Sequence, residues 1–360
     1  MPTRSLDSLT LLGFKSHRAL DEFSLTQRNV LIGAHASGKT NLLDFFRLLR
    51  ALARDGLRDF VARSGGGEGL LFRGPRQPGA IEATLMFGDN SFRVRLQPTA
   101  SDELMVKDIA LLWMPDQEWR VFPRGRAEAG ISAWADHRLP DAPERLSRDG
   151  QVHAAIAGWS VHHFADTAPM RRAVDPADHH ELAEDGGNLA AVLADLRRTH
   201  PAAYQQILAA LQQLVPDLDD LHLEPAGPDN LLHLQWRQTG DPHLFQPAQL
   251  ADGALRFLAL ATVLLQPEPP ATLVLDEPDL GLHPLALRRL AGLLHAASAR
   301  AQLIIATQSP ELVRSFDPED IILVQRRHGA SELQRMTAPA LAEWRKQHDP
   351  GELIAEAAAP

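Results

Sequence analysis

Cysteine is absent from the 360-residue chain. Without a thiol, the protein has no disulfide, thiolate zinc site, iron–sulfur cluster or cysteine nucleophile. Lysine occurs only four times, so arginine supplies nearly all of the positive charge, and the formal net charge is -10. This balance excludes a globally basic surface, although a local basic patch is compatible with it.

Long apolar runs are also missing. No uncharged apolar run reaches about 18 residues, so we expect no transmembrane helix and no membrane partner. The N-terminal segment mixes charged and apolar residues and lacks the apolar core of a signal peptide, so we expect a cytoplasmic protein. Apolar residues make up 44% and charged residues 23%, as in ordinary globular proteins.

Strand and helix patterns alternate at both ends of the chain. A compact, mostly apolar run at 29–32 is typical of a strand buried on both faces, and leucines and phenylalanines at helical spacing follow from 42 to 52. Later, the pattern predicts helices over 248–265 and 285–299, between strands that include 273–275, 303–306 and 321–324. This alternation predicts a parallel sheet with crossover helices.

The middle of the chain has a different pattern. Alternating residues over 80–122 predict several antiparallel strands. The composition of 124–150 predicts a surface loop, and apolar spacing predicts one helix around 189–196 and a second that begins at Pro201. Residues 229–238 are typical of another strand.

A glycine-bearing loop follows the first buried strand. It fits the pattern G-x-x-x-x-G-K-[ST], and its residues are Gly33, Ala34, His35, Ala36, Ser37, Gly38, Lys39 and Thr40. The N–H groups of such a loop surround phosphate oxygens, and the following helix N-terminus adds partial positive charge. We expect Lys39 to reach the β- and γ-phosphates and Thr40 to ligate Mg²⁺. The alternative is an ordinary glycine turn, which the strand–loop–helix context disfavours.

Two carboxylates stand where the strand around 273–275 ends. They are Asp276 and Glu277. A buried carboxylate is costly unless a cation lies nearby. We therefore expect Asp276 to hold Mg²⁺, directly or through a water, and Glu277 to orient or deprotonate the attacking water. The alternative is an acidic helix-capping turn before Pro278.

Polar residues also end the next strand, at Thr307, Gln308 and Ser309. Their side chains either contact the γ-phosphate or the attacking water, or form a Ser/Thr turn that leads into the short helix after Pro310. The residues alone leave both interpretations open.

As a set, these motifs resemble those of the ABC-type ATPases, in the RecF/SMC/OLD branch. NVLIGAHASGKTNLLDFF, QLADGALRFLAL, LDEPDLGLHP and ATQSPELV are similar to that branch's phosphate loop, signature, Walker B with D-loop, and switch segments. VHHFADTAPMRR and GGNLAAVLADLR look like the middle of a compact, RecF-like AAA ATPase family.

The resemblance implies an α/β fold: an ABC-type P-loop NTPase head with a mixed sheet, an antiparallel β subdomain and an inserted helical lobe. It implies ATP and Mg²⁺ as cofactors and Asn41 as a further nucleotide contact. It also implies Lys39, Glu277 and Gln308 as the catalytic residues.

In that family two heads hold two ATP molecules between them, so the resemblance implies a homodimer that forms on ATP binding. The signature residues Ala251, Asp252 and Gly253 of one subunit would cover the γ-phosphate held by the other, and the N–H groups of a helix start suit that role. The family's signature serine is replaced by Ala251, so one hydroxyl donor to the γ-phosphate is missing; by analogy this either costs about 100-fold in rate or is compensated by backbone N–H groups. The loop asparagine is replaced by His35. We therefore expect slow hydrolysis with preserved nucleotide binding.

We interpret residues 1–360 as a single ABC-ATPase head. Its expected parts are a nucleotide-binding core (1–60 and 245–336), an antiparallel β subdomain (80–123), an inserted, mainly helical lobe (150–240) and a C-terminal helix or tail (337–360). The middle lacks the heptads of an SMC coiled coil. The resemblance also implies a Q-loop glutamine there, for which Gln117 and Gln151 are both candidates.

The favoured function is an ATP-hydrolysing, dimerising RecF/SMC-like ATPase that acts on DNA in repair, recombination or anti-phage defence. The alternative is an ATP-dependent clamp for a partner effector protein with weak hydrolysis. A transporter-energising subunit predicts a signature near LSGGQ, and a GTPase predicts an NKxD motif; neither motif is present. We expect no intrinsic nuclease, because only about 50 residues follow Gln308.

Arginine pairs are the candidate DNA contacts, although solvated surface is the commoner role of any one pair. They lie at 171–172, 197–198, 288–289 and 326–327. His162–His163 beside Asp166, and His179–His180, are candidate metal ligands for which packing is the favoured interpretation.

Overall fold

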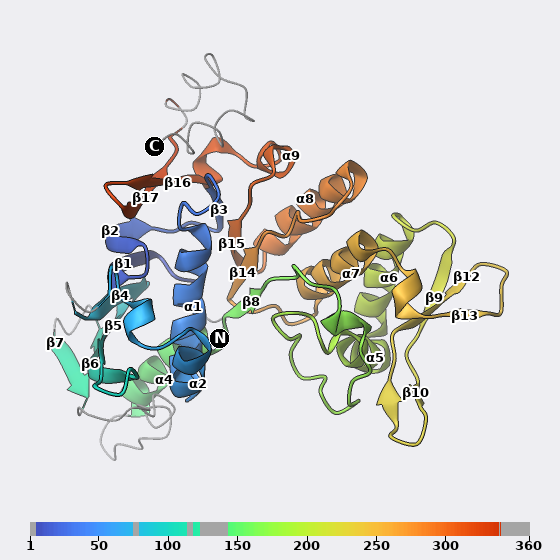
Figure 1. The fold of residues 1–360 in the computed structure, drawn as a ribbon, viewed down its shortest axis with the longest axis horizontal. Helices are drawn as coiled ribbons and strands as arrows, with labels where there is room; N and C mark the ends of the chain where they lie inside the picture. The colour runs from blue at the N-terminus through green and yellow to red at the C-terminus, as the bar shows by residue number, and fades with distance from the viewer. Residues whose placement is uncertain (1–4, 75–78, 114–117, 123–142, 338, 340–360) are drawn as a thin grey trace.

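Two six-stranded sheets organise the chain, and a mainly helical lobe extends to one side of them (Figure 1). The computed structural model describes residues 5–74, 79–113, 118–122, 143–337 and 339. Within these residues, no helix is both long enough and apolar enough to span a membrane.

The central sheet has the strand order β17-β16-β3-β15-β14-β8. Its strands are β3 (Arg28–Ile32), β8 (Ser160–His162), β14 (Thr272–Asp276), β15 (Gln302–Ala306), β16 (Ile321–Arg327) and β17 (Ala330–Arg335). Neighbouring strands are parallel except for β17, which runs antiparallel to β16. The parallel sheet predicted from the strand–helix alternation is confirmed.

Side chains of the parallel strands alternate between two hydrophobic cores. In β14, Leu273 and Leu275 face the core shared with the helical lobe, whereas Val274 faces the opposite core. Strands β3 and β15 alternate in the same way. Because both faces are covered, these strands have continuous apolar runs in the sequence.

The second sheet is antiparallel, with the order β2-β1-β4-β5-β6-β7. Its strands are β1 (Ser8–Phe14), β2 (His17–Ser24), β4 (Ile81–Phe87), β5 (Asn90–Pro98), β6 (Leu104–Trp113) and β7 (Glu118–Phe122). Because β1 pairs with β4, the first two strands join the sheet that the sequence predicted from residue 80 onward. Helix α1 (Lys39–Ala53) lies between the two sheets, next to α2 (Leu57–Arg63) and a 3₁₀ turn at Glu68–Leu70 (Figure 1).

Helix α4 (Pro143–Ala157) corrects two expectations. It begins inside the segment 124–150 that the composition predicted as a loop, of which residues 124–142 lie outside the described part. Val152, Ala155 and Ile156 of α4 recur at helical spacing and are buried in the core around α1. Residues 150–162, assigned above to the inserted lobe, therefore pack with the nucleotide-binding core.

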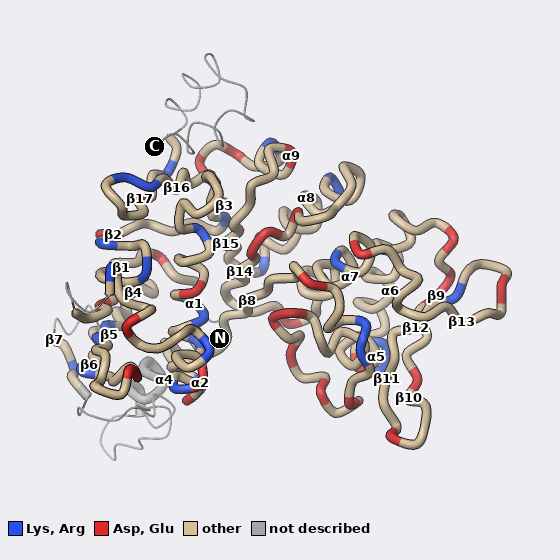
Figure 2. The backbone as a smooth tube through the Cα atoms, in the orientation of Figure 1, with Lys and Arg blue, Asp and Glu red and all other residues tan. Residues whose placement is uncertain are grey.

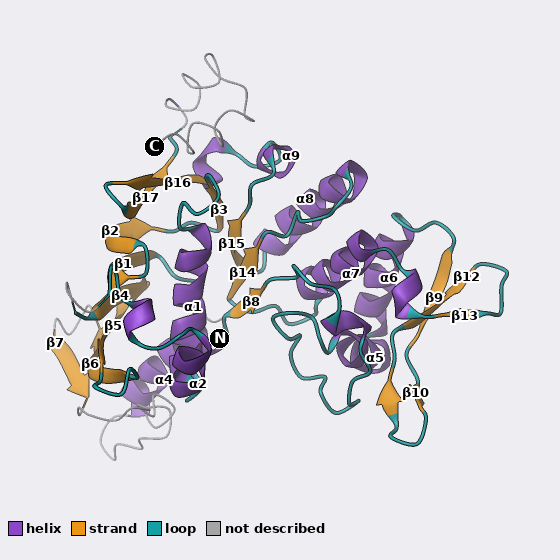
Figure 3. Ribbon diagram, in the orientation of Figure 1, coloured by secondary structure: helices purple, strands orange, loops and turns teal. Residues whose placement is uncertain are grey.

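The inserted lobe follows β8 and groups its helices apart from the antiparallel sheet (Figure 3). Its elements are α5 (Leu189–Thr199), α6 (Pro201–Gln212), β9 (Leu218–His222), β10 (Pro225–Ala226), β11 (Leu231–Leu232), β12 (Gln235–Gln238), β13 (Leu244–Phe245) and α7 (Asp252–Leu265), with 3₁₀ turns at Pro169–Arg171 and Pro247–Gln249. The lobe therefore extends past residue 240 into the segment 245–265, assigned above to the nucleotide-binding core. The single strand predicted over 229–238 is two strands, because β11 pairs with β10 whereas β12 pairs with β9 and β13.

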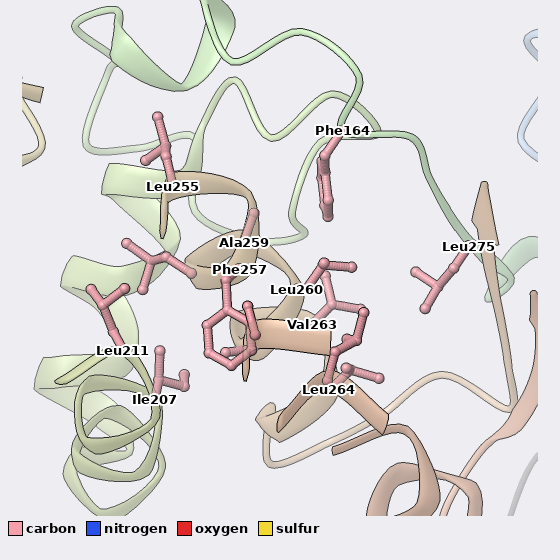
Figure 4. Close-up of a cluster of buried hydrophobic side chains, with 14 of the residues drawn as sticks. Phe164, Ile207, Leu211, Leu255, Phe257, Ala259, Leu260, Val263, Leu264 and Leu275 are labelled. Carbon is pink, nitrogen blue, oxygen red and sulfur yellow. The ribbon is translucent and has the colours of Figure 1, made fainter. Parts of the chain in front are cut away.

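Helix α7 joins the lobe to the central sheet. Phe257 of α7 packs near Ile207 and Leu211 of α6, and Leu260 lies on the side of Leu275 in β14 (Figure 4). A helix that is apolar on all sides is stable only when it is buried on all sides. The lobe and one face of the sheet therefore share a continuous core.

The C-terminal third completes the sheet with helices α8 (Pro284–Ser298) and α9 (Pro310–Val313) and a 3₁₀ turn at Pro318–Asp320. The C-terminal helix or tail expected over 337–360 lies outside the described residues, apart from positions 337 and 339.

Candidate active site

The loop of residues 33–40 leaves the end of β3 and enters α1. Gly38 caps the helix with a φ of 110°, a conformation that side-chain-bearing residues rarely adopt. Lys39, Thr40 and Asn41 form the first turn of α1, so their N–H groups have no partner within the helix and lie at the positive end of its dipole. The loop therefore has the local geometry of an anion site.

Lys39 is buried and its amine points back into the loop. Nζ donates to the carbonyl oxygens of Gly33 at 2.6 Å and Ala34 at 2.9 Å. Burial lowers the pKa of the Lys39 amine, while the carboxylates of Glu277 and Asp276 oppose that shift. The predicted cation and the two predicted carboxylates are therefore electrostatic neighbours.

Asp276 ends β14 with a side chain that solvent barely reaches, at 3% exposure. Within the described part of the chain, neither carboxylate oxygen has a hydrogen-bond partner. Oδ2 lies 3.8 Å from His163 Nδ1 and 3.9 Å from a guanidinium nitrogen of Arg47. Burial is the main cause that raises the pKa of this carboxyl. A divalent cation would remove the cost of the two unpartnered oxygens.

Glu277 and Gln308 lie together at the ends of β14 and β15. The Gln308 amide donates from Nε2 to Glu277 Oε1 at 2.8 Å, and the Glu277 N–H donates to the carbonyl of Ala306 at 2.8 Å. Glu277 has a φ of 47°, in the left-handed region that is costly for a residue with a side chain. Backbone strain of this kind gathers at functional sites.

The two interpretations of residues 307–309 apply to different residues. Thr307 Oγ1 donates to Asp279 Oδ1 at 2.5 Å and accepts from the N–H of Ser309 at 3.0 Å. Ser309 in turn caps α9 by accepting from the N–H of Leu312. Thr307 and Ser309 therefore form the turn, whereas Gln308 faces the predicted catalytic carboxylate.

One cavity of about 690 Å³ is lined by three segments that are far apart in the sequence, within 35–64, 163–184 and 276–277. It is lined by His35 and Thr40 of the loop, Asp44, Arg47, Arg50 and Arg54 of α1, His163, Glu184, Asp276 and Glu277, with further residues of α1 and α2. The phosphate loop and the predicted acidic pair, far apart in the sequence, thus share one space.

Arg47 is a site residue that the sequence reasoning missed. Its side chain is 12% exposed, and it pairs with Asp44 at 2.8 Å and with Glu184. Thr40, Asp44 and Arg47 are spaced at i, i+4 and i+7, which places them on one face of α1. That spacing after the phosphate loop is the signal that could have identified Arg47.

Further ion pairs fasten α1 to the loop between β8 and α5. Arg50 pairs with Glu181, and Arg54 pairs with the second oxygen of Glu181 at 2.8 Å. Basic residues on α1 and acidic residues in that loop are visible in Figure 2. These contacts, with Arg47–Glu184, form an arginine clasp between the core and the inserted lobe.

His163 lies beside Asp276 in the cavity. It directly follows β8, and its Nδ1 lies 3.1 Å from the Asp276 main-chain oxygen. Gln117 lies outside the described residues, and Gln151 lies in α4 and does not line the cavity.

The other histidines of the pairs have packing contacts. His162 is fully buried, its Nε2 lies 2.6 Å from Ser160 Oγ, and burial lowers its pKa to about 3. His179 and His180 stack on each other. Among the residues that the structure describes, no group of three or more histidine or acidic side chains is arranged to hold a metal ion.

The signature residues lie on the inserted lobe, at the start of α7. Ala251 is the N-cap and offers no side-chain hydrogen bond, and Gly253 is in the first turn. Asp252 accepts from Thr167 Oγ1 at 2.7 Å and from Arg171 at 2.5 Å, and these two donors lower its pKa. None of residues 251–253 lines the cavity of its own chain.

The four candidate DNA-binding arginine pairs differ in how many of their side chains already bind other groups of the protein. Arg171 is committed to Asp252 and to two main-chain oxygens, and Arg197 and Arg198 pair with aspartates. Arg288 and Arg289 are exposed on α8. Arg326 and Arg327 are exposed at the end of β16, and Arg327 lies 4.0 Å from Glu332. The pairs at 288–289 and 326–327 are therefore more available than the other two.

Comparison with known proteins agrees with this geometry. Residues 28–314 match the family described as "AAA domain, putative AbiEii toxin, Type IV TA system". No curated protein matches the chain.

Solved SMC heads have a similar fold. One is an SmcHead bound to the C-winged helix domain of ScpA, with 18% identity over 94% of this chain and 99% of that one and a TM-score of 0.61. A second is an Smc head domain with an extended coiled coil bound to the C-terminal domain of ScpA, derived from Pyrococcus furiosus. It has 16% identity over 95% of this chain and 98% of that one, with a TM-score of 0.57. A third is an Smc head domain with a coiled coil and joint, derived from Pyrococcus yayanosii. It has 13% identity over 98% of this chain and 99% of that one, with a TM-score of 0.58.

At these identities the likeness to SMC heads shows the fold, and it confirms the predicted ABC-type, SMC/RecF-like α/β head. The family match covers most of the chain and includes both the phosphate loop and the acidic pair Asp276–Glu277. The chain therefore belongs to the family described as "AAA domain, putative AbiEii toxin, Type IV TA system", and its fold is that of an SMC head.

Proposed function

We propose that the chain binds ATP together with Mg²⁺ and hydrolyses it slowly. The observation that supports this most strongly is the buried, unpartnered carboxylate of Asp276 in the same cavity as Thr40. A carboxylate and a hydroxyl are ligands that suit Mg²⁺. When bound, the ion would neutralise phosphate charge as the terminal phosphoryl group is displaced.

The side chains of the chain itself would divide the remaining work. The loop N–H groups and Lys39 would bind the phosphates, and Glu277 would orient the attacking water and receive its proton. Because Gln308 donates to Oε1 of Glu277, the other carboxylate oxygen is available for that proton. Gln308 would thereby hold the base in a fixed rotamer.

Completion of the site requires a second copy in this proposal. The cavity of one chain includes none of residues 251–253, and α7 begins with N–H groups that suit an anion. We propose that ATP binding forms a homodimer in which each α7 start covers the other subunit's γ-phosphate. The closed dimer would exclude water from the nucleotide.

The biological setting we favour is a DNA-related process: repair, recombination or anti-phage defence. The SMC-head fold and the exposed arginines at 288–289 and 326–327 support it. Two of the similar SMC heads are complexes with ScpA domains, which also supports a partner protein.

A second candidate is an ATP-dependent clamp for a partner effector. The specific observation in its favour is the N-cap of α7, where Ala251 has no hydroxyl to donate. Loss of one such donor costs about 100-fold in rate while leaving the backbone N–H groups in place. The chain would then still bind ATP, although it would hydrolyse it only slowly.

Size-exclusion chromatography with light scattering, with and without Mg²⁺–ATP, tests the proposal when combined with phosphate release. We expect wild type to dimerise with ATP and turn over slowly, Glu277→Gln to dimerise with at least about 100-fold less turnover, and Lys39→Ala to remain monomeric. ATP-dependent dimers with no turnover in wild type would favour the clamp.

The DNA proposal is tested separately. Duplex and single-stranded DNA are titrated into wild type with Mg²⁺–ATP at about 50 mM salt and again at higher salt, where phosphate contacts weaken. Binding that falls with salt is expected. No binding to either DNA at the lower salt would contradict the DNA-related role and leave the ATPase proposal intact.

A further inference from the structure

The hairpin of β16 and β17 lies directly behind the phosphate loop. A Cβ at Gly33 would lie 2.2 Å from the carbonyl oxygen of Val324 in β16, and a Cβ at Gly38 would lie 2.0 Å from Ser331 Oγ in β17. Both distances are too short for a side chain. The two glycines are therefore required by the hairpin as well as by backbone conformation.

Ser331 links the hairpin to the loop through a chain of hydrogen bonds. It is 2% exposed, and its Oγ lies 2.6 Å from the carbonyl oxygen of Ser37 and 2.8 Å from Ser16 Oγ. Asn41 Nδ2 donates to Ser16 Oγ at 2.8 Å. The network thus begins and ends in the phosphate-loop region and passes through the β1–β2 turn and β17.

Hydrogen counting fixes the direction of this chain. A serine hydroxyl has one proton to donate, and a carbonyl can only accept. Ser331 therefore donates its one proton to the Ser37 carbonyl. Ser16 is then the donor in the contact between the two serine hydroxyls. Asn41, Ser16 and Ser331 then form one ordered series that ends on the Ser37 carbonyl.

The Ser37 carbonyl belongs to the same peptide unit as the Gly38 N–H. In a trans peptide the C=O and N–H bonds point in opposite directions. A carbonyl held toward the hairpin therefore turns the Gly38 N–H toward the opposite side, where the phosphates would bind. The bond also restrains the loop before a ligand arrives, which reduces the entropy lost on binding.

His17 acts in the same way on the next peptide unit. Its Nε2 lies 3.1 Å from the Gly38 carbonyl, and burial lowers its pKa to about 4, so the ring is neutral near pH 7. Because the carbonyl only accepts, Nε2 has the proton and donates it. This second bond orients the Lys39 N–H, the first of α1.

We propose that Ser331 is a positioning residue for phosphate binding: its hydroxyl holds the Ser37 carbonyl and thereby aims the Gly38 N–H at the bound phosphate. The inference rests on the proposed ATP binding and extends it to a residue 294 positions away in the sequence. It makes the β16–β17 hairpin part of the nucleotide site, although Ser331 does not line the cavity.

The test is a calorimetric titration of the intact chain with Mg²⁺ and AMP-PNP, a non-hydrolysable ATP analogue. Ser331→Ala should raise Kd about tenfold, which corresponds to about 1.4 kcal/mol. The matched control is Ser298→Ala, which removes another buried hydroxyl that donates to a main-chain oxygen, that of His295 at 2.8 Å, at the end of α8. Its Kd should stay within about twofold of wild type.

Thermal unfolding without nucleotide separates positioning from general stability. Ser331→Ala loses two buried hydrogen bonds and Ser298→Ala loses one, so we expect Tm to decrease in both variants, more in Ser331→Ala, and affinity to decrease in Ser331→Ala alone. Equal Kd values for Ser331→Ala and wild type would overturn the inference while ATP binding stands. No binding by wild type would overturn the proposed function and this inference with it.

Hydrogen exchange of wild type keeps the inference testable if Ser331→Ala does not fold. Because the hairpin and the loop are joined, AMP-PNP should slow amide exchange in 330–335 as well as in 33–41. Protection that is confined to 33–41 would contradict the inference.

Discussion

Substitution of Asp276 by asparagine should stabilise the ligand-free protein and abolish its stabilisation by Mg²⁺–ATP. The carboxylate is 3% exposed, neither oxygen has a hydrogen-bond partner, and burial raises its pKa. His163 and Arg47 offset part of this cost from 3.8 Å and 3.9 Å. An asparagine of the same shape removes the buried charge and introduces two N–H donors that can find acceptors.

The size of the effect follows from the unpartnered oxygens. Buried acceptors without donors cost about 1–3 kcal/mol, and we take about 2 kcal/mol here. For a chain of this length, an unfolding entropy of about 2.1 cal/mol/K per residue converts that gain to roughly 3 °C in Tm. Nucleotide at about 100 times its Kd should add about 2.7 kcal/mol, or roughly 3–4 °C, to wild type and little to Asp276→Asn.

Differential scanning calorimetry at pH 8 measures both effects, first with EDTA and then with Mg²⁺–ATP. For an acid whose folded pKa is raised, the destabilisation is present above the folded pKa and disappears as the pH falls through the ordinary aspartate range. The difference in Tm between Asp276→Asn and wild type should therefore become smaller as the pH is lowered. Asp220→Asn is the control, because that carboxylate accepts from Tyr204 at 2.9 Å and its loss should lower Tm.

Two results would refute this reasoning. A lower Tm for Asp276→Asn than for wild type in EDTA would mean that the carboxylate is satisfied in the ligand-free protein. An undiminished gain in Tm with Mg²⁺–ATP would mean that the cation binds elsewhere.

Three further predictions concern other parts of the fold. Ala251→Ser should add a capping hydroxyl to α7, worth about 1 kcal/mol or roughly 1 °C in Tm, and should raise the phosphate-release rate in the dimer; no gain in rate would argue against a role of the signature in hydrolysis. Glu184→Gln should weaken the arginine clasp at Arg47, lower Tm by about 1 °C and speed hydrogen exchange in 163–188, whereas exchange unchanged from wild type would show that the clasp does not restrain the lobe. Burial lowers the pKa of His17 to about 4 and that of His162 to about 3, below the ordinary 6.5, so the unfolded chain takes up protons at these two rings before the folded chain does. As pH drops from 6.5 toward 4, the urea midpoint of wild type should therefore fall relative to that of a His17→Gln, His162→Gln variant, in which Asp276 is unchanged. The same pH dependence in both proteins would contradict the buried neutral rings.

The sequence predicted the parts of the site that depend on local pattern. The phosphate loop has its residues in one continuous segment after a buried strand, and Asp276 and Glu277 directly follow another such strand. Parallel strands bring their carboxyl ends to one edge of a sheet, so the two segments could be expected to meet.

Residues that act across long sequence separations were not predicted. Ser331 contacts Ser37 only because β17 pairs with β16 behind the loop, and a lone serine in a polar hairpin has no distinguishing pattern. His163 stands beside Asp276 because a three-residue strand, β8, pairs with β14, and such a short strand gives little periodicity to recognise. From the sequence alone, this histidine is only one of a pair for which packing is the favoured interpretation.

Helix α4 was missed for a related reason. Its first half is rich in charged residues and follows a segment rich in arginine and acidic residues, so composition favoured a loop over 124–150. Only its second half has apolar residues at helical spacing, and these are the ones that pack near α1. The stability of this helix therefore depends more on its tertiary packing than on its local sequence.

The most direct test of the central claim is a calorimetric titration of ATP into the wild-type chain with and without Mg²⁺, alongside Lys39→Ala. The account predicts one ATP bound per chain with Mg²⁺, weaker binding without it, and a loss of at least about 100-fold in affinity for Lys39→Ala. Absence of binding heat in folded wild-type protein, or equal affinity in Lys39→Ala, would contradict it.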